Sequence, residues 1–265
     1  MQVHSLTDFR DTAYGPFRNH MSRLIEVCGT PEFEKSMFQA ARDAAQCEHL
    51  TAFHFTPTST PRAVLAINTG NLPIAQAVAA KYIQQYWNLD PANHVRTDLA
   101  RDGKRYVVSF SCDEIDDGSY RRDCYVNVGL QQRISLMRSV GDAVYRVNFY
   151  KTPGAGLFSP EEMAHIFEAS DLVTSLLSKH DSLAAPSNVL GSDVSDFFER
   201  RLRLLNRGLP RREIQVCALI AKGLSSEGIA LELGISVNTV LTHRKRSYAR
   251  LDISSQNELM RLLMN

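Results

Sequence analysis

Residues 224–251 read LSSEGIALELGISVNTVLTHRKRSYARL, and this stretch decides the fold of the C-terminal part of the chain. Its apolar residues recur every three or four positions, which predicts helices at 226–233 and 237–250. The segment 234–236, Gly-Ile-Ser, combines a residue that readily ends a helix with one that caps the next. Two helices joined by so tight a turn form a helix-turn-helix.

The helical pattern continues on both sides of this stretch. A helix is expected at 211–221, ended by Gly223. A terminal helix opens with the capping box at 255–258, Ser-Gln-Asn-Glu. We therefore predict an all-α module of four helices over residues 208–265.

The helix expected at 237–250 has two chemically different faces. Val240, His243, Ser247 and Leu251 recur at helical spacing and are expected to face inward. The opposite stripe is mostly small or polar, so it can approach base edges closely, and basic residues beside it suit phosphates. The residues expected at DNA are Asn238, Thr239, Leu241, Thr242, Arg244, Lys245, Arg246 and Ala249, with Arg250 as a further phosphate contact. A merely solvated face would show the same charges, so this pattern alone leaves both interpretations open.

A larger set of residues repeats, in register and without gaps, the pattern of a known family. The set comprises LPRRE at 209–213, IAKGLS at 220–225, IA at 229–230, LGIS at 233–236, TV at 239–240, His243, Leu251 and SS at 254–255. Through these residues the module resembles the LuxR-type helix-turn-helix. The resemblance implies a transcription regulator that binds double-stranded DNA as a homodimer at a two-fold symmetric site, with the helix at 237–250 in the major groove.

Five positions depart from the usual pattern of that family. Pro210 stands where the family has a capping threonine, which forfeits a cap worth roughly 1 kcal/mol. Glu227-Gly228 replaces a Lys-Glu pair and forms a helix less readily. Ser247 stands at a usually aliphatic position. Leu241 replaces a basic residue, so we expect it to meet a thymine methyl instead of a phosphate.

The first 181 residues mix helical and strand periods. Helices are expected at 31–47, 73–87, 91–101 and 159–179, and strands at 51–56, 63–68, 105–111, 133–140 and 143–150. The last two strands form a hairpin around Gly141, and capping signals at Thr30 and Ser159 open the first and last helices. We predict an α+β chain: an N-terminal α/β/α sensor sandwich with an antiparallel sheet, similar to autoinducer-binding, GAF or PAS domains, followed by the helical module.

Composition and charge support a division into three segments. Residues 184–188, AAPSN, have the composition of a linker, and a helical pattern resumes at 193–207. We expect a sensing or dimerisation domain at 1–181, a linker with an amphipathic helix at 182–207, and the DNA-binding domain at 208–265. The last 73 residues, 193–265, carry 12 basic and 8 acidic side chains and the rest of the chain has a net charge of −3, as a DNA-binding module attached to an acidic body would.

An element at residues 86–91, Tyr-Trp-Asn-Leu-Asp-Pro, resembles the Tyr-x3-Asp-Pro element of autoinducer-binding domains, and Gly129-Leu130 is similar to another of their turns. In that family the aspartate accepts a hydrogen bond from the ligand amide, so the resemblance implies this role for Asp90. The aromatic residues expected around the ligand are Tyr82, Tyr86, Trp87, Phe53, Phe55 and Phe110. Ala77 and Lys81 stand where the family has tryptophan and tyrosine. We therefore expect a small, partly apolar ligand other than an ordinary acyl-homoserine lactone.

A simpler interpretation of the same residues stays open. Asp90 would be a helix cap, Pro91 the first residue of the following helix, and the aromatic side chains ordinary core. The N-terminal domain would then dimerise or bind a partner protein without a small ligand.

Composition bounds the remaining possibilities. No apolar run reaches 18 residues and no signal peptide opens the chain, so a cytoplasmic protein without a membrane partner is expected. The five cysteines lack paired spacing, and Cys47, His49 and His54 form the nearest approach to a metal site without indicating one. With no nucleophile elbow, phosphate loop or dinucleotide fingerprint, we expect neither an enzyme nor a cofactor.

Overall fold

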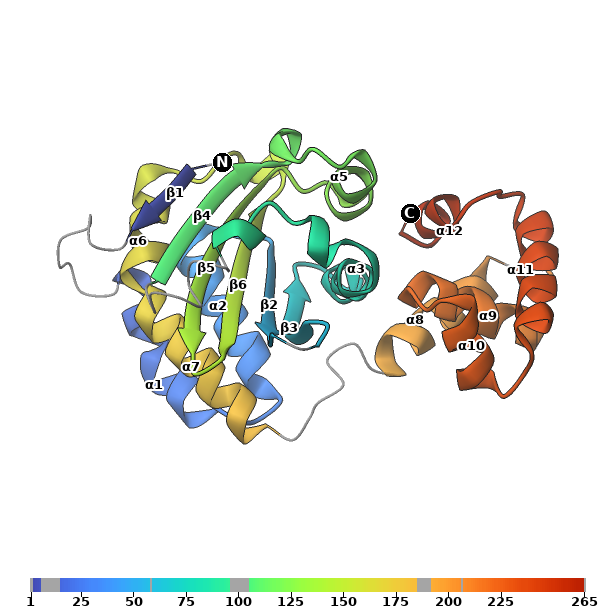
Figure 1. Cartoon of the computed structure of the whole chain (residues 1–265), viewed down its shortest axis with the longest axis horizontal. Helices are drawn as coiled ribbons and strands as arrows, with labels where there is room; N and C mark the ends of the chain where they lie inside the picture. The colour runs from blue at the N-terminus through green and yellow to red at the C-terminus, as the bar shows by residue number, and fades with distance from the viewer. Residues whose placement is uncertain are drawn as a thin grey trace.

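An antiparallel sheet forms the centre of the N-terminal part (Figure 1). The computed structural model describes residues 2–5, 15–57, 59–95, 105–184, 192–205 and 207–264. In these residues the strand order is β1 (Gln2–Ser5), β4 (Arg105–Ser111), β5 (Gln132–Val140), β6 (Ala143–Lys151), β2 (His49–Phe55) and β3 (Arg62–Asn68). The five predicted strands and the hairpin are confirmed, and Gly141 has the positive φ of +59° that the hairpin turn requires. The sequence does not predict β1, whose four residues are too few for an alternating pattern to show.

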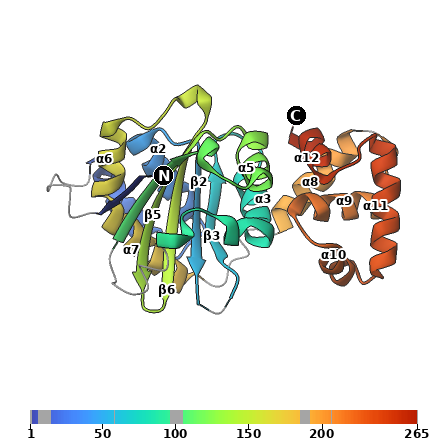
Figure 2. The ribbon, with the colours of Figure 1, turned by 45° about the horizontal axis from the view of Figure 1, so that its top comes forward.

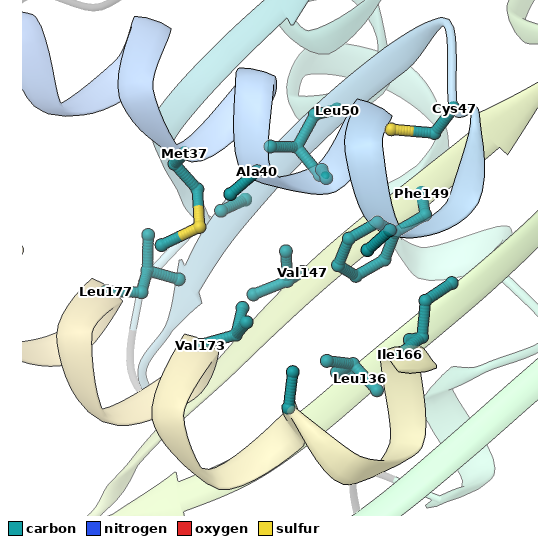
Figure 3. Packing of buried hydrophobic residues seen from close by; sticks show 14 of the residues in the cluster. Met37, Ala40, Cys47, Leu50, Leu136, Val147, Phe149, Ile166, Val173 and Leu177 are labelled. Carbon is teal, nitrogen blue, oxygen red and sulfur yellow. The ribbon is translucent and has the colours of Figure 1, made fainter. Parts of the chain in front are cut away.

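Helices cover one face of this sheet and bury a large apolar core against it. They are η2 (Gly15–His20), α1 (Met21–Glu26), α2 (Glu32–Ala45), α6 (Pro160–Glu168) and α7 (Ser170–Leu183). Figure 3 shows Met37 of α2 beside Leu177 of α7 in this core, which also contains Phe149 of β6, and all three are at 1% exposure or less. Burial of apolar surface of this kind is the main force that holds a helix layer on a sheet.

The opposite face carries a second helical layer (Figure 2). It contains α3 (Ile74–Lys81), which continues as a π-helix (Tyr82–Tyr86) and a 3-10 turn (Trp87–Leu89), and also α5 (Gly118–Cys124). The uninterrupted α-helix predicted at 73–87 is therefore wrong after Lys81. The π-helix has one more residue per hydrogen-bonded turn, a distortion that is frequent at functional sites.

Two further predictions about the N-terminal part need correction. Thr30 does not cap α2, because its hydroxyl donates to the carbonyl of Val27. The single helix predicted at 159–179 is two helices that meet at Ala169, although the capping box at Ser159 is confirmed. Helices α1 and α5 were not predicted. Of the helix predicted at 91–101, the residues after 95 lie outside the described part of the chain.

The C-terminal part is all helical, as predicted. It contains α8 (Ser192–Leu204), α9 (Arg211–Lys222), α10 (Ser226–Leu233), α11 (Val237–Leu251) and α12 (Gln256–Met264). Ser225 and Ser236 cap α10 and α11 by accepting from backbone N–H groups three residues on, each at 3.1 Å. Gly223 and Gly234 end α9 and α10 in the left-handed region. One apolar core joins these helices, and α8 contributes Phe198 and Leu202 to it.

None of the helices among the described residues combines the length and the apolar character that a membrane crossing needs.

Candidate functional site

Helix α11 presents the exposed face that the sequence predicts. Val240, Ser247 and Leu251 are buried at 3% exposure or less. His243 is only half-buried, so its predicted inward position is confirmed in part. The residues of the expected DNA face that are exposed are Asn238, Leu241, Thr242, Lys245, Arg246 and Ala249.

Two of the residues expected at DNA are held partly by the protein itself. Thr239 is half-buried, and its hydroxyl lies 2.8 Å from that of the capping Ser236. The Arg244 guanidinium lies 5.2 Å from the centre of the Tyr248 ring, a cation–π distance. Both side chains are half-buried, and their contact with DNA stays a prediction.

Arg250 has a structural role that the sequence did not reveal. Its guanidinium donates to the carbonyl of Gly208 at 2.6 Å and lies 3.5 Å from the Glu213 carboxylate, which is 3% exposed. A buried carboxylate needs such a partner. Arg250 therefore fastens α11 to the start of α9, a role that competes with the phosphate contact expected of it.

The seven residues expected at a ligand lie together on the face of the sheet that carries α3 and α5. Five of them are buried in one cluster, and Trp87 packs against it. The five are Phe53, Phe55, Tyr82, Tyr86 and Phe110. Asp90 is buried too, and accepts a hydrogen bond from Tyr82 of this cluster. The structure thus places these residues together, whereas their role as a ligand site stays a prediction.

Asp90 lies at the centre of a buried polar network that includes two arginines. Its carboxylate accepts two hydrogen bonds from Arg133, at 2.7 and 2.9 Å, and lies 3.2 Å from Nη1 of Arg146. The hydroxyls of Tyr82 and Tyr120 donate to it at 2.9 and 3.2 Å. We refer to Asp90, Tyr82, Tyr120, Arg133 and Arg146 as the Asp90 cluster.

One contact of Asp90 fits its simpler interpretation as a cap, and its other contacts go beyond that interpretation. The Ala92 backbone N–H donates to Asp90 Oδ1 at 2.9 Å, which fixes the turn into the next helix. Burial alone would raise the pKa of the Asp90 carboxyl, but Arg133 and Arg146 hold that pKa below its ordinary value. The carboxylate is therefore ionised while buried, which a cap alone would not require.

Sequence reasoning missed both arginines, although a signal for them exists. Arg133 and Arg146 lie on β5 and β6, the two central strands, where the register pairs them with Phe110 and Phe53 of the neighbouring strands. Both arginines are at most 1% exposed. A charged residue at an inward position of a central strand is rare because burial of a charge is costly, so it marks a candidate site.

Between the two arginines the sheet carries a row of buried polar side chains. Ser135 donates to Asn148 at 2.8 Å, and Asn148 donates to Thr51 at 3.1 Å. All three residues are at most 4% exposed. This face of the sheet therefore combines aromatic walls with a polar floor, as small-molecule sites do.

A chain of contacts leads from the Asp90 cluster to the C-terminal module. Tyr86 stacks on Tyr120 and donates to Asp123 at 2.6 Å. Lys81 pairs with the same carboxylate at 2.6 Å and donates to Asn257 of α12 at 3.1 Å. Figures 1 and 2 both show α3 and α5 on the side of the sheet nearest α12.

Cys47 and His54, from the sequence pattern nearest to a metal site, have different surroundings. Cys47 is fully buried, and His54 lies 3.0 Å from Asp181. Among the described residues no three histidine, cysteine or acidic side chains are arranged to hold a metal ion.

Comparison with known proteins shows likeness at both ends of the chain. The family model described as bacterial regulatory proteins, luxR family, matches residues 207–263. The oxygen regulatory protein NreC of Staphylococcus haemolyticus is 40% identical over 52 residues, which is 20% of this chain and 24% of that protein. The VqsR LBD domain of Pseudomonas aeruginosa aligns with 64% of this chain and 99% of that structure, at 15% identity and a TM-score of 0.47. Escherichia coli SdiA aligns with 93% of this chain and 96% of that structure, at 14% identity and a TM-score of 0.43.

A longer sequence match decides the family. A candidate HTH-type transcriptional regulator in the exeN 3'region of Aeromonas salmonicida is 30% identical over 160 residues, which is 56% of this chain and 80% of that protein. Together with the luxR-family match over α9 to α12, this likeness shows that the chain belongs to the LuxR family of helix-turn-helix transcriptional regulators.

Proposed function

We propose that this LuxR-family regulator binds promoter DNA as a homodimer through α11, and that a small, partly apolar molecule bound at the Asp90 cluster controls that binding. The observation that carries the sensing role is the buried network of Asp90 with Arg133 and Arg146, set among aromatic side chains. An ordinary core does not need two buried guanidinium groups, because apolar residues would stabilise it as well or better.

The DNA-binding role is supported by the exposed stripe of α11. Asn238, Thr242 and Lys245 share this stripe with Leu241, which is 46% exposed. An exposed leucine among polar side chains suits contact with a thymine methyl in the major groove.

The contacts of Lys81 support a coupling between the two parts. Lys81 joins Asp123, which accepts from Tyr86 beside the Asp90 cluster, to Asn257 of the DNA-binding module. A ligand that moves Tyr86 or Tyr120 would shift Asp123, and thereby the contact between Lys81 and Asn257. Control of DNA binding then requires only that the ligand binds two arrangements of the parts with different affinity.

In the experiment, the full chain first selects its binding sites from a pool of random DNA duplexes, and its affinity for the selected sites is then measured. We expect affinity to fall steeply with salt concentration, because phosphate contacts release counterions. An organic extract of the source organism's culture should raise the Tm of the protein and change its DNA affinity, whereas extract of sterile medium should not. Salt-independent or absent DNA binding would contradict the DNA-binding role.

The alternative function is a dimerisation or partner-binding domain without a small ligand. It predicts that the culture extract changes neither Tm nor DNA affinity, while sedimentation still shows a dimer. That result would reject the sensing role and leave the DNA-binding role in place.

A further inference from the structure

We infer that the molecule sensed at the Asp90 cluster is a monoanion, such as an amphiphilic carboxylic acid, whose charged group is bound by Arg133 and Arg146. This inference rests on the proposed sensing function and specifies the chemical class of the ligand. It follows from a charge imbalance inside the protein, from hydrogen-bond donors without partners, and from the surroundings of both guanidinium groups.

The buried charges of the cluster do not balance. Arg133 and Arg146 together carry two positive charges, and Asp90 supplies one negative charge. Asp123, the next buried carboxylate, is already paired with Lys81 at 2.6 Å. Among the described residues no other carboxylate forms an ion pair with either arginine, so the site keeps a net charge of one positive unit away from water.

Neither arginine can relieve this imbalance by losing its proton. Burial disfavours the charged form, but Asp90 and the neighbouring tyrosines together outweigh that effect, so the pKa of both guanidinium groups is raised. The Tyr82 and Tyr120 hydroxyls cannot supply a negative charge, because burial raises the pKa of both phenols.

Three N–H-bearing nitrogens of the two guanidinium groups are buried without a hydrogen-bond acceptor in the described residues: Nε of Arg133, and Nε and Nη1 of Arg146. Nη1 of Arg146 lies 3.2 Å from Asp90 but does not have the geometry of a hydrogen bond. Buried donors of charged groups are almost always satisfied in native proteins, so these positions call for an acceptor. A carboxylate supplies up to four lone pairs and one negative charge, and would correct both deficits together.

The surroundings favour an anion that also has an apolar part. Arg133 lies 4.1 Å from the Phe110 ring centre and Arg146 lies 4.6 Å from that of Phe55, so aromatic rings face both guanidinium groups. These contacts leave the edges of the guanidinium groups as the positions for an acceptor. Beside them, the buried hydroxyl of Ser135 and the Asn148 amide can orient a polar head group.

The first arm of the test compares charged and neutral probes of the same shape on the full chain. The probes are phenylacetate and octanoate, each against its amide. We expect at least one carboxylate at a few times its Kd to raise Tm by about 2–4 °C, and the matching amide to have little effect. Stabilisation by the amides with no response to the carboxylates would overturn the anion inference and leave the sensing function intact.

The second arm removes the excess charge without any ligand. Arg146→Met leaves one arginine paired with Asp90, so we expect the ligand-free variant to be at least as stable as the natural chain and to lose the carboxylate response. Arg23→Met, at a side chain that is 59% exposed, is the matched control and should keep both properties.

A lower Tm for ligand-free Arg146→Met, together with no carboxylate response in the natural chain, would show that Arg146 is a structural residue and would overturn the inference. If Arg146→Met fails to fold, the comparison of carboxylates with amides on the natural chain decides. Culture extract that acts only after its acidic components are removed would also contradict the inference, while it would still support sensing.

Discussion

The Lys81 ammonium group lies 3.1 Å from the side-chain oxygen of Asn257 and thereby joins the end of α3 to the first turn of α12. Lys81 is 8% exposed, and its other partner is the Asp123 carboxylate. Gly223, at the end of α9, lies beside the same residue: a Cβ added there would lie 3.6 Å from the Lys81 backbone nitrogen. The end of α3 is therefore where the N-terminal part meets the DNA-binding module.

The two partners of Lys81 predict different effects of mutation. Lys81→Met leaves the buried Asp123 carboxylate with only the longer and more exposed pair to Arg122, at 3.6 Å. We therefore expect a loss of about 3 kcal/mol in the free energy of unfolding, the lower end of the cost of breaking a buried ion pair. Asn257→Ala removes one hydrogen bond and should cost about 1 kcal/mol or less. Urea unfolding measures both losses, and small-angle scattering should show a larger radius of gyration for Asn257→Ala. Equal losses for the two variants would contradict the assignment of Asp123 as the main partner.

Asp90 can be tested against a residue that is only a cap. We expect both Asp90→Asn and Asp90→Ala to destabilise the ligand-free protein by about 3–5 kcal/mol, because either change removes the anion between two buried guanidinium groups. Asp117 caps α5 by accepting from the Tyr120 backbone N–H at 2.7 Å and provides the control. Asp117→Asn should be nearly neutral, and Asp117→Ala should cost about 1 kcal/mol. Tolerance of Asp90→Asn in urea unfolding would show that its charge is unimportant.

Lys245 and Val240 separate DNA contact from folding on one helix. Lys245→Ala should leave the unfolding midpoint unchanged and reduce the slope of log affinity against log salt by about 1. Val240→Ala should destabilise the module by about 1–3 kcal/mol, because Val240 is fully buried and its truncation leaves a cavity. If Lys245→Ala unfolded the module and Val240→Ala left its stability unchanged, the faces of α11 would be assigned wrongly.

Arg250 should behave differently from its basic neighbours on α11. Arg250→Ala removes the partner of the buried Glu213 carboxylate, so we expect destabilisation of about 2–4 kcal/mol. In protein that remains folded, the salt slope of DNA binding should not change. If Arg250→Ala lowered the salt slope of DNA binding and left the stability unchanged, Arg250 would be a phosphate contact, as the sequence suggested.

His49 predicts a window of acid sensitivity. Burial lowers the pKa of His49 to about 4, whereas in the unfolded chain it is about 6.5. The unfolded state therefore takes up a proton as pH falls below about 6.5 and the folded state does not, so stability is lost between about pH 6.5 and pH 4. The loss should approach about 3 kcal/mol at the lower limit. Urea unfolding at a series of pH values should show this slope reduced in His49→Leu, and an unchanged slope would assign the acid sensitivity to other groups.

The sequence by itself determined the C-terminal module almost residue by residue. Ser236 and Gly234 act through hydrogen bonds and backbone angles that lie within a few residues of them. The spacing of the apolar residues in α11 also predicts which face of the helix is buried. Such signals are local, so they can be recognised in the sequence before any tertiary structure is known.

The tertiary structure decided which residues form the Asp90 cluster and how that cluster connects to the C-terminal module. Strand period shows which neighbours in each strand share a face with Arg133 or Arg146. Only the pairing of β5 with β6, and of β6 with β2, places both arginines on one face at Asp90, which precedes Arg133 by 43 residues. The change from α-helix to π-helix after Lys81 likewise has no local signal, since its tyrosines bond to Asp90 and Asp123. Contacts between distant segments depend on register and packing, which no local period specifies.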